Sequence, residues 1–237
     1  MSIKQDPKLK NTLLTAVEIA AVVLFAIWFC RNWLTLDPLM TPENYTDVMV
    51  QPEYAMVIRS NAIWNTFREC GACFLWNGSL KGGYPAFAEM QGSVFHPFVI
   101  LFTLLFGVAN GSKFILVAAF ITAGLAQWWI GFIMELRRVA RVWAAWVAIT
   151  AGTLATRMEL GVVGIILSTV MASLAIAAVM NLIRKRNGRA AVIFTLALVL
   201  LILSGQAYVQ VGFLLVVPLS LLPLLIEHSS CCLLYTS

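Results

Sequence analysis

The chain has 237 residues, of which 61% are hydrophobic and 11% are charged, and its mean hydropathy is +0.88. Because a soluble domain carries about 25% charged residues, this composition excludes a soluble globular enzyme, a disordered tail and a disulfide-rich secreted module. The net charge of +5 lies in short clusters between apolar segments, which indicates membrane topology rather than nucleic-acid binding. We therefore expect an all-α polytopic membrane protein.

The first apolar segment, Thr12–Leu34, follows Lys4, Lys8 and Lys10. It is longer than the core of a signal peptide, which has about 7–15 residues. We predict an uncleaved transmembrane helix whose N-terminus lies in the cytoplasm. Glu18 falls within this helix, close enough to its start that we expect it at the cytoplasmic interface.

Five further spans bring the predicted total to about six. They are Ser112–Met134, Val142–Thr156, Leu160–Ile183, Ala190–Ser204 and Val211–Ile226. The connections carry two basic clusters, namely Arg137, Arg138 and Arg141, then Arg184, Lys185, Arg186 and Arg189. If both clusters are cytoplasmic, Ser112–Met134 must run from the outside to the inside.

Residues 35–92 are then a long extracytoplasmic first loop that carries surface helices. The next segment, 96–109, has an apolar core of only Phe98–Phe106. Such short stretches are more often interfacial or re-entrant than spanning. We therefore expect residues 96–109 to lie on or dip into the outer face of the membrane.

Apolar residues at helical spacing predict a surface helix within Glu53–Cys70. Cys70 and Cys73 suit a local disulfide or two free thiols better than a metal or redox site. From Trp76 onward a stretch rich in glycine and aromatic residues looks too irregular for helix or strand. Aromatic rings such as Trp76 offer stacking faces for sugar rings.

A resemblance to a known family rests on this stretch. The run Phe74–Pro97, FLWNGSLKGGYPAFAEMQGSVFHP, resembles the first outer loop of YfhO-like bacterial membrane proteins. Gly78 stands where that family often has proline, and His96 where it often has tyrosine. The later run Ser204–Gln210, SGQAYVQ, also resembles that family, and the similarity extends over about residues 12–228.

The resemblance implies a C-type (GT-C) glycosyltransferase in the bacterial cytoplasmic membrane. These enzymes take a sugar from a polyprenyl-phosphate donor and transfer it to an extracytoplasmic glycan, polymer or protein. Family members have more spans, so residues 1–228 are expected to be the N-terminal part of such a domain. Residues 229–237 differ abruptly in composition and are expected to be a foreign tail.

Sugar transfer needs a base that takes a proton from the acceptor hydroxyl. In the family this base is an acidic residue soon after the first span, where Asp37 stands here. Glu53, Asp47 and Glu43 are alternative candidates. The alternative for Asp37 is a carboxylate that only caps a turn before Pro38.

Other residues are candidates for substrate binding. Glu159 stands where related enzymes use a second acid to bind a metal or position the acceptor, and Arg157 and His96 could contact a phosphate. Their alternatives are an interfacial Arg157–Glu159 ion pair and a solvated histidine. No cofactor is indicated beyond a divalent cation, whose ligands the sequence does not define.

The sequence leaves two alternatives to a glycosyltransferase open. One is a non-enzymatic transporter or flippase for a lipid-linked sugar, which would place ionisable groups at the bilayer midplane. The other is an inactive fragment. The acidic residues gather in the outer loop rather than within the predicted spans, which favours chemistry at the membrane surface.

Overall fold

Long apolar helices make up most of the chain that the structure describes. The computed structural model describes residues 7–34, 36, 62–78, 82–85, 93–159 and 162–219. Within these residues, four helices are long and apolar enough to cross a membrane, and two shorter apolar helices accompany them. The expected helical class is confirmed at this level, and the number of spans stays a prediction.

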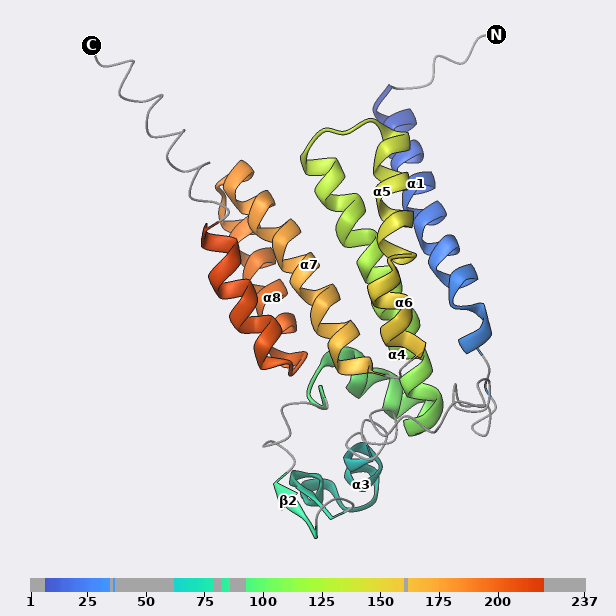
Figure 1. Cartoon of the computed structure of the whole chain (residues 1–237), viewed down its shortest axis with the longest axis vertical. Helices are drawn as coiled ribbons and strands as arrows, with labels where there is room; N and C mark the ends of the chain where they lie inside the picture. The colour runs from blue at the N-terminus through green and yellow to red at the C-terminus, as the bar shows by residue number, and fades with distance from the viewer. Residues whose placement is uncertain are drawn as a thin grey trace, which may run out of the picture.

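A central helix, α4, organises the bundle. It contacts α1, α5 and α7, and α8 packs against α7 (Figure 1). Buried apolar side chains from these helices, among them Val22, Phe120, Ile149 and Leu167, form one continuous core. The helices of the bundle are α1 (Pro7–Phe29), η1 (Arg31–Trp33), α4 (Pro97–Ile133), α5 (Arg138–Ile149), α6 (Gly152–Glu159), α7 (Val163–Lys185), α8 (Gly188–Leu203) and an unlabelled helix Ala207–Leu219.

The helix ends beside the basic clusters lie at one end of the bundle, here called the basic end. In Figure 1 the start of α1, the turn between α4 and α5 and the turn between α7 and α8 are all at the top. The Arg184 side chain of α7 donates to the carbonyl oxygen of Ile133 at the end of α4, which fixes two of these ends together. A common end is what cytoplasmic basic clusters require.

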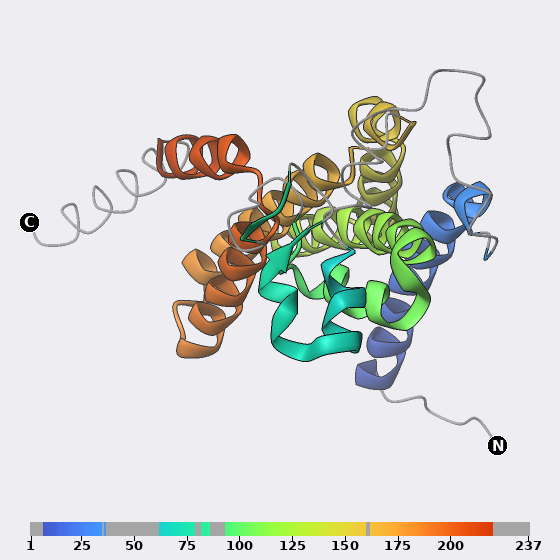
Figure 2. The same ribbon diagram turned by 90° about the horizontal axis from the view of Figure 1, so that it is seen from below.

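The opposite end carries the elements of the predicted outer loop. These are α3 (Ile63–Cys70), η3 (Gly71–Leu75) and an antiparallel pair of two-residue strands, β1 (Trp76–Asn77) and β2 (Tyr84–Pro85). Figure 2, which looks onto this end, shows α3 beside the first turns of α4. Ile63 and Trp64 of α3 pack there against Val94, so part of the face predicted to be apolar is buried against protein, whereas Phe67 of the same face is 43% exposed.

Helix α4 is two helices joined by a sharp break. Gly107 has φ 78° and ψ 176°, which no helix accommodates, and after it the chain folds back on itself. The ring centroids of Phe106 and Phe114 are 4.3 Å apart, and a Cβ on Gly111 would lie 2.8 Å from the carbonyl oxygen of Phe102. The short first helix thus matches the segment predicted to be re-entrant, although its depth in a membrane stays a prediction.

Two details differ from the sequence-based expectations. The predicted span Val142–Thr156 falls within Arg138–Met158, one of the four helices long and apolar enough to cross a membrane, but the helix has a short break at Thr150 and Ala151, between α5 and α6. The glycine-rich stretch expected to be irregular contains the short β1–β2 pair. The structure also joins Cys70 and Cys73 in a disulfide, one of the two alternatives expected for them.

Candidate functional site

The predicted site residues divide into described and undescribed groups. Asp37 and Glu53 lie outside the described residues, and so does the side chain of Glu159, whose backbone ends α6. The structure does place Trp76, His96 and Arg157. All three belong to elements at the end of the bundle opposite the basic end, where the predicted outer loop lies.

Trp76 is presented by the β1–β2 pair. It pairs with Pro85, and 56% of its surface is exposed. Gly83 passes close beneath the indole, since a Cβ there would lie 2.6 Å from Trp76 Nε1, and its φ of +100° suits only glycine. The tight loop therefore orients a largely exposed aromatic ring, as sugar stacking would require.

His96 is buried rather than solvated, contrary to its simplest expected role. Its Nδ1 accepts the backbone N–H of Phe98 at 3.2 Å and caps α4. Burial lowers the pKa of His96 to about 4, so the ring is neutral at pH 7. A neutral ring could offer a phosphate one N–H donor at most, and the buried Nε2 has no partner in the described structure.

A cluster of three serines connects the two runs that carry the family resemblance. Ser93 Oγ, at the end of the outer-loop run, donates to the carbonyl oxygen of Ser204 at 2.5 Å. Ser168 Oγ of α7 bonds to the same carbonyl at 3.1 Å. All three residues are buried. The fold therefore brings together segments that are 111 residues apart in the sequence.

Lys113 is a buried cation that the sequence analysis missed. It is 1% exposed, and its Nζ donates to Asn110 Oδ1 at 3.3 Å. Asn110 Nδ2 in turn donates to the carbonyl oxygen of Leu36 at 2.8 Å. The signal was present, because Lys113 is the only charged residue in the predicted span Ser112–Met134.

Arg157 is exposed on α6 and lies close enough to Tyr208 for its charge to act on the phenol. Tyr208 belongs to the second run that resembles the family. The expected pairing of Arg157 with Glu159 falls outside the described side chains. Within the part of the chain that is described, no three His, Cys, Asp or Glu side chains are placed to hold a metal ion.

A second polar cluster lies toward the basic end. Glu18 is 6% exposed, and its Oε1 is 3.0 Å from Arg138 Nη1 and 3.2 Å from Arg141 Nη2. Trp128 Nε1 donates to Oε2 at 3.0 Å. Glu18 thus lies toward the basic end, as its place near the start of α1 predicts. Its carboxylate is enclosed between α1, α4 and α5 rather than solvated.

The two clusters differ in what they can do. The Glu18 carboxylate is enclosed and both of its oxygens accept hydrogen bonds, although Arg141 Nε beside it has no partner among the described residues. The opposite end offers an exposed indole, a buried lysine and a buried histidine nitrogen without a partner. Comparisons of the chain with protein-family models, with curated proteins and with solved structures find no match.

Proposed function

We propose that this chain belongs to an integral-membrane glycosyltransferase of the C type. It would move a sugar from a polyprenyl-phosphate donor to an extracytoplasmic glycan, polymer or protein. The proposal includes about six spans in a bacterial cytoplasmic membrane, with the N-terminus in the cytoplasm. Asp37 would act as the base, with Glu53 as the alternative.

The observation that carries this proposal is the bond between Leu36 and Asn110. Leu36 directly precedes the predicted base in the sequence, and its carbonyl oxygen is held by Asn110, which also accepts from the buried Lys113. Sugar transfer needs positive charge near the departing phosphate and a base near the acceptor. The link from Lys113 through Asn110 to the residue that precedes the predicted base supports that chemistry.

Each group has a proposed role in the transfer. The Asp37 carboxylate would take the proton of the acceptor hydroxyl as its oxygen attacks the sugar carbon. Lys113 would stabilise the charge on the leaving phosphate, and the Trp76 indole would stack on a sugar ring. Arg157 and Glu159 would contact donor or acceptor at the same end, with or without a divalent cation.

The test is sugar transfer in membranes from cells that express the chain, with radiolabelled polyprenyl-phosphate sugars as donors. Asp37→Asn should lower turnover about 10²–10⁴-fold, and donor binding should change little because asparagine keeps the shape of aspartate. Glu53→Gln and Glu159→Gln are measured alongside. If Asp37→Asn keeps full activity while one of them loses it, the base is misassigned.

A transporter or flippase for a lipid-linked sugar is the second candidate, and two observations favour it. Transporters bind substrate where helices are interrupted, and the chain is interrupted at Gly107 and again between α5 and α6. Such a protein would move a labelled lipid-linked sugar across vesicles without an acceptor. Retained movement in Asp37→Asn, with no transfer in any variant, would establish this function instead.

A further inference from the structure

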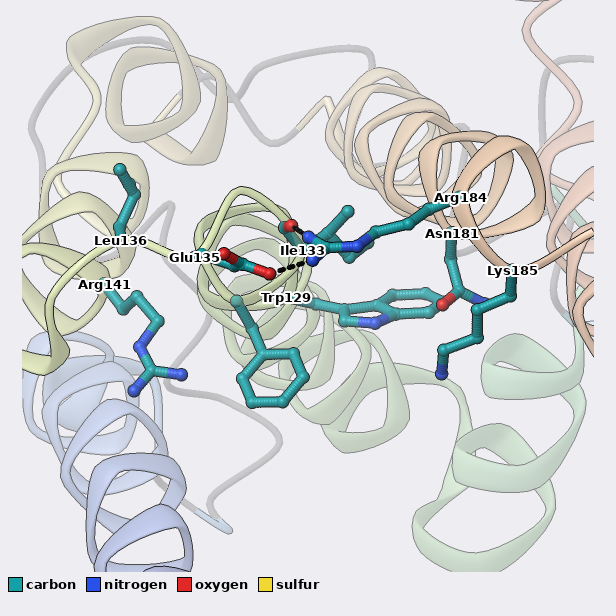
Figure 3. A pocket seen from close by; sticks show the side chains of 9 residues that line it. Trp129, Ile133, Glu135, Leu136, Arg141, Asn181, Arg184 and Lys185 are labelled. Atoms are coloured by element: carbon teal, nitrogen blue, oxygen red, sulfur yellow. Dashed lines mark hydrogen bonds and ion pairs between the residues drawn. The ribbon is translucent and has the colours of Figure 1, made fainter.

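A cavity of about 460 Å³ opens at the basic end, between α4, α5 and α7. Figure 3 shows Asn181, Arg184 and Lys185 of α7 on one side of this pocket and Arg141 of α5 on the other. The Trp129 side chain lies between them. The pocket lies at the other end of the bundle from the proposed transfer site. Its volume is within the range of small-ligand sites, about 300–1,000 Å³.

The charge of the pocket is positive. Three basic residues line it, namely Arg141, Arg184 and Lys185, against the single carboxylate of Glu135. Glu135 is paired with Arg184. Lys185 forms no hydrogen bond or ion pair with the residues that the structure describes, so its ammonium remains available to an anion.

Two further polar groups of the pocket lack hydrogen-bond partners among the described residues, one beside Lys185 and one on the opposite side of the pocket (Figure 3). Asn181 is 2% exposed and forms no hydrogen bond within the described part of the chain, although its amide lines the pocket. Arg141 Nε is buried without a partner. The Asn181 amide therefore has a donor free for a ligand that accepts hydrogen bonds.

The remaining walls of the pocket are apolar and aromatic. Trp129, Phe132 and Leu136 line it, and Phe132 and Leu136 are also partly exposed toward the outside of the bundle. A soluble anion would gain little from such walls. A lipid could place its phosphate among the basic groups while its chains lie along the apolar helices.

We propose that this pocket binds the phosphate of an anionic phospholipid at the basic end of the bundle. Lys185 and Asn181 donate to the phosphate oxygens, and the rings of Trp129 and Phe132 contact the glycerol and the first chain carbons. The site is separate from the proposed sugar transfer, and its test scores lipid binding without any donor or acceptor.

The experiment is native mass spectrometry of the full chain in detergent, titrated with short-chain phosphatidylglycerol. Phosphatidylcholine of the same chain length and soluble glycerophosphate are titrated in parallel. Phosphatidylglycerol should bind more tightly than either. Lys185→Gln should weaken this binding about fivefold, the effect of one cation at a membrane surface, and Asn181→Leu about tenfold.

Arg189→Gln is the matched control, because it removes the same charge from the same basic cluster without touching the pocket. It should leave phosphatidylglycerol binding unchanged. An equal loss in Arg189→Gln and Lys185→Gln would show general attraction to the basic end and overturn the site. Glycerophosphate binding as tight as that of the lipid would assign the pocket to soluble phosphate esters and overturn the lipid.

Discussion

Glu18 shows how a single buried carboxylate can hold three helices together. It accepts from Arg138 and Arg141 of α5 and from Trp128 of α4 while lying on α1. Arg141 also lies over the ring of Phe132, with its Cζ 5.2 Å from the centroid. Removing one partner of a buried ion pair leaves the other charge uncompensated.

Glu18→Gln should therefore destabilise the protein by about 3–5 kcal/mol, because Arg141 stays buried without a counter-charge. The measurement is the midpoint of thermal unfolding in detergent. Glu135→Gln is the control, since its pair with Arg184 is exposed on both sides and should contribute about 0–1 kcal/mol. Equal shifts in the two variants would show that burial adds nothing to the Glu18 cluster.

His96 should make stability depend on pH. Its pKa falls from 6.5 to about 4 on folding because the ring is desolvated. Between these pH values the unfolded state binds a proton that the folded state excludes, so the free energy of unfolding decreases as pH falls. The contribution is fully present above pH 6.5 and reaches about 3 kcal/mol, at 1.36 kcal/mol per pKa unit.

The measurement is chemical unfolding of wild type and His96→Asn across this pH range. Asparagine keeps an acceptor for the Phe98 N–H at the start of α4 and has no titrating ring. The variant should lose most of the pH dependence that wild type shows between pH 6.5 and 4. An unchanged slope in the variant would mean that other groups cause it.

For single residues, the sequence predicts where along a helix a polar side chain lies better than it predicts which side chains contact it. The position of Glu18 near the basic end follows from its short distance in sequence from the start of α1. Its hydrogen-bond partners depend on how α1 packs against α4 and α5. His96 was expected at an interface because polar residues usually face water. The structure buries it at the start of α4 instead, with its ring against Phe98, and the sequence pattern carries no signal for this burial.

At the scale of elements, α4 is the helix whose break defines the bundle. The boundary was predictable, because the apolar core Phe98–Phe106 is too short to span. The return of this short helix onto the long one was not, since it depends on two glycines. Gly107 provides the positive φ, and Gly111 allows the backbones to approach where they cross.

Gly111→Ala should destabilise the protein by about 1–3 kcal/mol, the usual cost of overpacking. The new Cβ would lie 2.8 Å from the Phe102 carbonyl oxygen, which is backbone and cannot rotate away. Gly188→Ala is the control, because nothing lies within 4 Å of its Cβ position. Thermal unfolding should show a large shift for Gly111→Ala only, and equal shifts would contradict the close crossing.

The interruption between α5 and α6 shows why helix boundaries within apolar segments are hard to predict. Val142–Thr156 reads as one span because its residues are apolar almost throughout. The structure ends α5 where Thr150 bonds back to Trp146 and Val147 and starts α6 at Gly152. Thr122 and Thr169 make the same bond within continuous helices, so neither this bond nor the composition of the segment predicts the boundary.

At the scale of the whole molecule, the structure gathers the ends that carry basic clusters, as the predicted topology requires. The two basic clusters of the connections, at residues 137–141 and 184–189, lie at helix ends that the structure brings to the same end of the bundle. The run that resembles the family's outer loop lies at the other end, where Ser93 bonds to Ser204 at the start of the second run that resembles the family. The sequence could predict this arrangement because topology follows from charge and segment length alone.

Cysteine labelling of the full chain in intact cells tests this topology. Cysteines introduced at Ser79 and Asn110, in a background free of other thiols, should react with a membrane-impermeant maleimide added from outside. A cysteine at Arg189 should react only after the membrane is opened, because the basic clusters prefer the cytoplasmic side. The outcome depends on the short helix before Gly107. If this helix does not cross the membrane, residue 110 lies on the same side as the predicted outer loop. Labelling of the Asn110 position from the cytoplasm alone would make Pro97–Phe106 part of a crossing, and it would reverse the orientation proposed for every later helix.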